Sequence, residues 1–214
     1  MTNPEVMRAS VDTVGENLIS GLQNMLGNME RSNGKLRIKM VDDDAFTLGE
    51  DIATTPGKVV YQNDLIQLIQ FAPTTKKVYR RPLLIMPPWI NKYYILDLRS
   101  ENSFIRWAVD QGHTVYVVSW VNPDETLAEM SFEDYMLQGP HCALALIEQA
   151  TGEREINAIG YCLGSTLLAS TLAYMAEKYD DRIKSATYFV TMIDFTEAGE
   201  LGVFIDEEQL ISLE

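Results

Sequence analysis

Cysteine and histidine are scarce in this sequence, with two of each among 214 residues. Cys142 and Cys162 lack the spacing of a zinc site or of a disulfide framework, so neither a metal centre nor a disulfide is expected. Two reduced thiols are typical of a cytosolic protein. Basic residues are also few, because 17 lysines and arginines stand against 31 acidic residues, for a formal net charge of −14. This balance argues against nucleic acid as a partner, since binding to phosphate backbones depends on lysine and arginine.

Long apolar runs are missing as well. No stretch reaches the length of apolar residues that a transmembrane helix needs. The N-terminus, MTNPEVMRAS, lacks the basic and apolar regions of a signal peptide, so we expect a cytoplasmic protein. Hydrophobic residues make up 46% and charged residues 22%, which is typical of a globular domain, alone or with one appendage.

The first 56 residues are predicted to form an N-terminal helical region. Apolar residues recur there at steps of three and four, the period of one amphipathic helix, before a break around Ser32, Asn33 and Gly34: they are Met7, Val11, Val14, Leu18, Leu22, Met25 and Met29. This apolar stripe either packs on its own domain or docks on a second subunit or a hydrophobic particle. The acidic run of Asp42, Asp43 and Asp44 indicates a solvated connection rather than a metal site.

Residues 57–214 show a different pattern, which predicts a parallel-rich α/β sheet with helices on both faces. Two apolar runs flank the turn dipeptide Asn63-Asp64, as in a β-hairpin. Apolar strands then alternate with helices, as parallel α/β folds require. We expect strands at 82–87, 114–120, 156–161 and 185–193, and helices at 101–111, 132–149 and 165–176.

The stretch AIGYCLGSTLLA places Cys162 where G-x-S-x-G hydrolases carry serine. It joins a predicted strand to a predicted helix, which is the context of a nucleophile elbow. Gly160 and Gly164 flank the cysteine, and a side chain at either position would collide across so tight a turn. A buried, inert thiol is the alternative reading of Cys162. Cys142 lacks such flanking glycines and is interpreted as structural.

An elbow nucleophile needs donors for the oxyanion that forms during attack. The thiol of Cys162 would lie at a helix N-terminus, which favours the thiolate, and the amide of Leu163 would face the oxyanion. A second donor in this architecture comes from the loop after an earlier strand, here PPWIN. Trp89, Ile90 and Asn91 are the candidates, and we select the backbone amide of Ile90.

The elbow and the stretch PLLIMPPWINKYYILDLRSENSFIRWAVDQGHTVYVVSWVNPDE together resemble the polyhydroxyalkanoate synthases, most closely those of class I. The resemblance implies an α/β-hydrolase core and an acyltransferase that polymerises (R)-3-hydroxyacyl-CoA, with Cys162 carrying the acyl chain. It implies no cofactor, because coenzyme A arrives on the substrate and leaves as product. Implied partners are 3-hydroxyacyl-CoA, the growing polyester or its granule surface, and a second subunit in a homodimer.

The resemblance also implies an aspartate and a histidine that lie beyond residue 214. His113 and His141 precede Cys162 and are interpreted as structural, as is Asp194 at the end of the last predicted strand. We therefore expect an incomplete core with an unpaired edge strand, inactive alone. Ser165 stands where the family usually has a second glycine.

Two other functions fit the sequence. The elbow alone would suit a cysteine-dependent hydrolase of the dienelactone-hydrolase kind, although the PPWINKYYILDL stretch speaks against this function. The missing histidine would suit a non-catalytic segment that only binds a partner synthase or a polymer granule.

Overall fold

The computed structural model describes residues 3–32, 34–42, 44–204, 206, 209 and 211. Asn33 of the predicted helix break, Asp43 of the acidic run and the chain end at Glu214 lie outside these residues. The chain divides into two compact units, Met1–Phe46 and Thr47–Glu214. The domain boundary expected after Pro56 stays a prediction.

The first unit contains two helices, α1 (Pro4–Asp12) and α2 (Glu16–Arg31), so the prediction of one continuous amphipathic helix was wrong. Between them, Val14 has a φ of 51° and Gly15 a φ of 85°. Helical backbone requires a negative φ, so two successive positive values end the first helix. The apolar stripe is therefore interrupted at Val14, the residue that was expected to continue it.

The second unit contains a six-stranded sheet in the order β1-β2-β6-β3-β7-β8. Its strands are β1 (Gly57–Gln62), β2 (Ile66–Phe71), β3 (Leu83–Met86), β6 (Val115–Trp120), β7 (Ile156–Tyr161) and β8 (Ile183–Phe189). The β1–β2 pair is the predicted antiparallel hairpin, which is thereby confirmed. β2 also runs antiparallel to β6, whereas β6, β3, β7 and β8 are mutually parallel. A separate two-stranded ribbon pairs β4 (Asp97–Arg99) with β5 (Asn102–Ser103).

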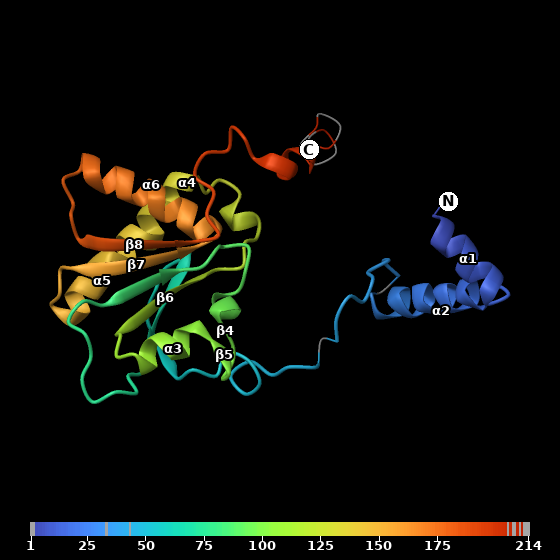
Figure 1. Ribbon diagram of the computed structural model, residues 1–214, viewed down its shortest axis with the longest axis horizontal. Coiled ribbons are helices and arrows are strands. Elements are labelled where there is room, and N and C mark those ends of the chain that lie inside the picture. Colours follow the sequence, from blue (N-terminus) through green and yellow to red (C-terminus); the bar gives the residue numbers. More distant parts are fainter. Residues whose placement is uncertain are drawn as a thin grey trace. The chain divides into compact units, whose positions relative to one another are not determined.

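Both faces of the sheet are covered, as the apolar strands predict. Successive side chains of a strand point to opposite faces. In β3, Leu84 and Met86 accordingly belong to one buried cluster and Leu83 and Ile85 to another. Figure 1 shows α3 (Phe104–Asp110) on the second face and α5 (Cys142–Thr151) and α6 (Leu163–Glu177) on the first.

The predicted helix at 132–149 forms in three pieces rather than one. α4 (Phe132–Met136) begins with a capping box, in which Ser131 and Asp134 exchange hydrogen bonds. A π-helical turn, Leu137–His141, then leads into α5. This turn contains Pro140, which lacks the N–H that an α-helix would use there. A wider turn takes up the proline without ending the helical run.

The last predicted strand is shorter than expected. β8 ends at Phe189, because Val190 has a φ of 50° that leaves the extended region. Within the described part of the chain β8 forms one edge of the sheet, as expected. Short 3-10 turns complete the fold: Tyr93–Leu96, Glu125–Leu127 and Gly199–Phe204. Across the described ranges, no helix is both long and apolar enough to span a membrane.

Candidate active site

Cys162 occupies the turn between β7 and α6, at the carboxyl end of the strand. Its φ of 53° and ψ of −123° lie outside the favoured regions for a residue with a side chain. Hydrogen bonds hold this conformation: its N–H donates to the carbonyl of Phe189 at 2.9 Å, and its own carbonyl accepts from Ser165 at 2.9 Å. Such strain at one residue, fixed by its surroundings, is characteristic of functional sites. Cys162 is partly exposed.

Both flanking glycines are required by close backbone contacts, as the sequence predicts. A Cβ on Gly160 would lie 2.4 Å from the Cα of Ser165, across the turn. A Cβ on Gly164 would lie 2.1 Å from the carbonyl oxygen of Met86. The second contact is with β3 rather than with the turn itself. Gly164 therefore brings the start of α6 directly against the end of β3.

The oxyanion donors expected from the sequence lie on these two neighbouring segments. Leu163 begins α6, and within the described residues its N–H has no hydrogen-bond acceptor. In the loop after β3, the N–H of Asn91 donates to the carbonyl of Pro88 at 3.1 Å, so that amide is already used. The amides of Trp89 and Ile90 have no acceptor in the same described ranges. The geometry thus leaves two of the three loop candidates available to bind an oxyanion.

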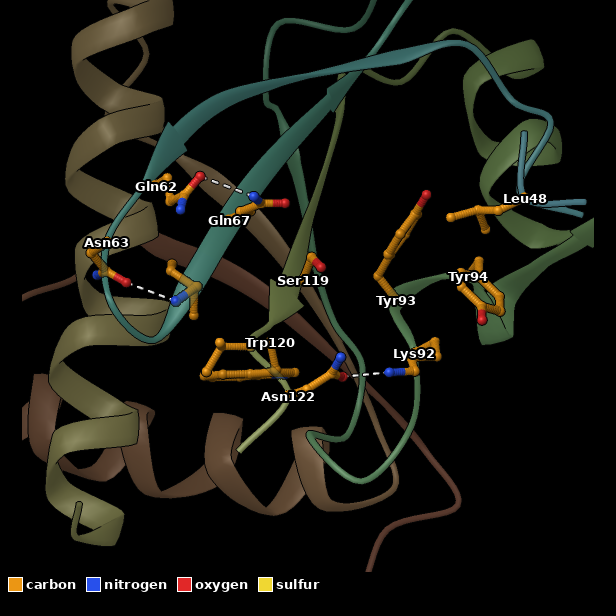
Figure 2. Close-up of a pocket in the computed structure, with 12 residues that line it drawn as sticks. Leu48, Gln62, Asn63, Gln67, Lys92, Tyr93, Tyr94, Ser119, Trp120 and Asn122 are labelled. Carbon is orange, nitrogen blue, oxygen red and sulfur yellow. Dashed lines mark hydrogen bonds between the residues drawn. The ribbon is translucent and has the colours of Figure 1, made fainter. Parts of the chain in front are cut away.

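The loop after β3 is attached to the end of β6 at two points. The indole N–H of Trp120 donates to the carbonyl of Pro87 at 2.8 Å. Farther along the loop, the ammonium group of Lys92 donates to the amide oxygen of Asn122 (Figure 2). Nothing in the sequence points to Trp120, because no motif marks a tryptophan at a strand end as part of a site.

A pocket of about 350 Å³ opens beside this loop (Figure 2). It lies between Lys92, Tyr93 and Tyr94 on one side and the start of β2 and the end of β6 on the other. Ligands of α/β folds commonly bind outside the carboxyl ends of the parallel strands. Cys162 lies at this same end of the strands. The lining is rich in carboxamide and phenol groups: Gln62, Asn63, Gln67, Asn122, Tyr93 and Tyr94. These groups suit uncharged carbonyl oxygens better than phosphates, since Lys92 is the one cation among the described residues that line the pocket.

Both histidines lie at the opposite end of the parallel strands, where these strands begin. His113 precedes the amino end of β6, and its ring packs 4.9 Å from that of Tyr79. His141 lies 3.4 Å from Arg182, which precedes the amino end of β8. Cys162 follows the carboxyl end of the parallel strand β7, and a six-residue strand spans roughly 20 Å. Neither histidine can therefore reach the thiol.

The remaining residues named from the sequence make contacts that fit structural roles. Cys142 begins α5, and its thiol, as the neighbour of the Tyr61 hydroxyl, raises the pKa of that phenol. Asp194 is exposed and accepts hydrogen bonds from Thr196, which lower the pKa of its carboxyl group. Ser165 is fully buried, with its hydroxyl 3.5 Å from the carbonyl of Phe189. Among the described residues, no group of three or more acidic, cysteine or histidine side chains could hold a metal.

Comparison with known proteins agrees with this architecture. A mutant of the esterase rPPE superposes with a TM-score of 0.50 at 14% identity, over 76% of this chain and 51% of that one. At this identity the likeness concerns the fold alone, which is that of an α/β-hydrolase core.

Sequence relatives cover the whole chain. A poly(3-hydroxyalkanoate) polymerase subunit PhaC of Rhizobium meliloti is 54% identical over 100% of this chain. The corresponding subunit of Cupriavidus necator is 43% identical over 96%. The chain spans about a third of the length of these relatives, 35% and 34% respectively. The family model described as poly-beta-hydroxybutyrate polymerase (PhaC) N-terminus matches residues 1–108. The chain belongs to this polymerase family.

Proposed function

We propose that this chain carries the nucleophile of an acyltransferase that polymerises 3-hydroxyacyl-CoA into polyester. The observation that carries the proposal is the strained cysteine at an α/β-hydrolase elbow, Cys162, in a chain 54% identical to a polyester polymerase subunit. Leu163 and either Ile90 or Trp89 would donate their backbone N–H groups to the oxyanion.

The chemistry explains why the elbow carries a thiol. The thiolate of Cys162 attacks the carbonyl carbon of the acyl-CoA, and the carbonyl oxygen becomes an oxyanion that backbone amides stabilise. The carbon–sulfur bond to coenzyme A then breaks, and coenzyme A leaves as a thiolate, which takes up the proton that the Cys162 thiol gave up. One thioester replaces another at little cost in free energy, so the acyl group stays activated. The hydroxyl of another unit attacks this thioester, which forms an ester bond and frees the Cys162 thiol.

The attacking hydroxyl must lose a proton to a general base. His113 and His141 lie near the amino ends of the parallel strands, whereas Cys162 lies at their carboxyl ends. The described residues therefore supply no histidine for this step. In the family that this chain resembles, an aspartate and a histidine follow the nucleophile in chain order. We propose that the same pair completes the site in the working enzyme.

The finer features of this function are also proposals. We divide the protein into an N-terminal helical region, residues 1–56, and part of the catalytic core, residues 57–214. The working enzyme is proposed to be a cytoplasmic homodimer that acts at the surface of polyester granules. Its substrate carries coenzyme A, and no cofactor takes part.

Acyl transfer to Cys162 can be measured in a hybrid in which this chain replaces the equivalent first third of the Rhizobium meliloti relative, because the chain alone is expected to be inactive. After incubation with 3-hydroxybutyryl-CoA, mass spectrometry should detect one 3-hydroxybutyryl group on Cys162, and hydroxylamine should remove it. The adduct should be absent from Cys162→Ala and present in Cys142→Ala, which removes the other thiol. An adduct on Cys142, or none at all, would contradict the proposed nucleophile.

Polymer formation needs the rest of the enzyme. Polyester made by the same hybrid can be measured in cells that lack their own polymerase. We expect polymer from the hybrid and none from its Cys162→Ala variant. Release of free 3-hydroxybutyrate without polymer would instead favour a hydrolase of the dienelactone-hydrolase kind.

A further inference from the structure

The indole of Trp120 holds the first residue of the loop after β3. Trp120 is the last residue of β6, and the residue is 8% exposed. Its Nε1–H donates to the carbonyl oxygen of Pro87, which directly follows β3, at 2.8 Å. Both groups are buried, so a loss of the indole donor would leave a buried carbonyl without its partner.

The same carbonyl lies against the elbow. A Cβ on Gly164 would be 2.8 Å from the oxygen of Pro87 and 2.1 Å from that of Met86. No side chain separates the loop from the start of α6 at this point. The position of the Pro87 peptide therefore sets the position of the following amides, including that of Ile90, relative to the amide of Leu163.

The helical run at 132–151 leaves a space for the indole. A Cβ on Gly139 would lie 2.6 Å from Cη2 of Trp120, closer than any Cβ contact allows. Gly139 belongs to the π-helical turn, and Tyr135 of α4 packs its ring 5.4 Å from that of Trp120. Trp89 of the loop packs edge-on against the same indole at 6.1 Å and also lies 5.2 Å from the ring of Tyr135. The indole is thus fixed between the helical run and the loop.

We propose that Trp120 is a positioning residue for acyl transfer, because its indole aligns the loop after β3 with the elbow and so completes the oxyanion site. This role rests on the proposed function, since it concerns the same amides. Catalysis is sensitive to such alignment: a displacement of about 1 Å can cost roughly 100-fold in rate. Gly139 contributes by leaving room for the indole.

The test compares two reactions of Cys162 in the hybrid polymerase, in which this chain replaces the first third of the Rhizobium meliloti relative. Acylation by 3-hydroxybutyryl-CoA passes through an oxyanion, whereas alkylation by iodoacetamide, a displacement at saturated carbon, does not. Trp120→Phe keeps an aromatic ring but removes the N–H donor. We expect it to slow acylation by roughly 10- to 100-fold and to leave alkylation unchanged. Trp107→Phe is the matched control, because Trp107 is 54% exposed on α3, and it should change neither rate.

Gly139→Ala tests the same role of the indole without changing Trp120 itself. Its methyl group should displace the indole and slow acylation while alkylation stays unchanged. In the Trp120→Phe background it should add little, because the smaller ring leaves space for the methyl group. Should Trp120→Phe fail to fold by circular dichroism, the comparison of Gly139→Ala with the unsubstituted chain decides alone.

Three results would overturn the proposal. The first is an unchanged acylation rate in a folded Trp120→Phe or Gly139→Ala variant. The second is an equal fall in acylation and alkylation, which would show a disturbed thiol instead of a disturbed oxyanion site. The third is the absence of any acylation at Cys162 in the unsubstituted hybrid, which would overturn the proposed function and this role with it. The first two results leave the proposed function intact.

Discussion

Thr55 donates its hydroxyl hydrogen to Oδ1 of Asp97 at 2.6 Å, and both residues are buried. The hydroxyl of Ser103 donates to the same oxygen at 2.5 Å, and the backbone N–H of Thr55 donates to Oδ2 at 3.3 Å. The carboxyl group is fully buried, and among the residues that the structure describes these three neutral groups are its hydrogen-bond donors. It joins the segment before β1 to the far end of the loop that carries the proposed oxyanion donor.

Asp97→Ala should lower the free energy of unfolding by about 2–4 kcal/mol, because it leaves buried donors of Thr55 and Ser103 without an acceptor. Urea unfolding followed by tryptophan fluorescence measures this loss. Asp124→Ala is the control, since Asp124 is exposed and caps a short 3-10 turn. It should cost about 1 kcal/mol or less. Equal losses in the two variants would contradict the importance of the buried carboxylate.

Gly164→Ala should destabilise the core by about 3 kcal/mol or more, the upper end for overpacking. The added Cβ would meet backbone, the carbonyl oxygen of Met86 at 2.1 Å, which cannot rotate away as a side chain could. Thermal unfolding by circular dichroism is the measurement. The matched control is Gly27→Ala in α2, where no atom lies within 4 Å of the new Cβ. That variant should be as stable as the unsubstituted chain or slightly more so.

Ser165→Gly should be tolerated, although Ser165 is fully buried beside the elbow. Its hydroxyl lies 3.5 Å from the carbonyl of Phe189, at the limit of a hydrogen bond. The expected loss is about 0.5–1 kcal/mol, from the greater backbone freedom of glycine in a helix. Acylation of Cys162 should keep its rate in this variant. A large fall in rate would mean that the serine itself, where the family usually has glycine, supports the elbow.

Stability in acid should depend on Asp181. Hydrogen bonds from Lys184 and Arg154 lower the pKa of its carboxyl group from 3.8 to about 2. A carboxyl group with a lowered pKa in the folded state stabilises that state above pH 3.8. The contribution disappears as the pH falls from 3.8 towards about 2. Its absolute size is small, because the group is exposed and water screens the ion pairs.

Asp181→Asn should therefore reduce the unfolding midpoint near neutral pH, and the difference from the unsubstituted chain should shrink between pH 3.8 and about 2. Urea midpoints across this range give the comparison. Glu129→Gln is the control: Glu129 is exposed and forms no ion pair with any residue that the structure describes. A constant difference at every pH would show that the ion pairs of Asp181 do not contribute.

Local sequence patterns were sufficient for most of the fold. The apolar runs predicted the hairpin and the parallel strands, because burial on both faces imposes a composition that needs no knowledge of neighbours. The glycines around Cys162 predicted the tight elbow, because a side chain at either position would collide across the turn. The N-terminal periodicity was misleading, since the apolar spacing continues through Val14 although the backbone there leaves the helix.

By itself, the sequence determined the fold class, the elbow and the family, because each of these depends on short-range patterns or on motifs that are contiguous in the chain. Only the tertiary structure placed both histidines at the end of the parallel strands opposite to the end that carries Cys162. It alone brought the indole of Trp120 to the carbonyl of Pro87, 33 residues away. Such contacts depend on strand order and on the space left by Gly139, and neither is encoded in the residues on either side of the tryptophan.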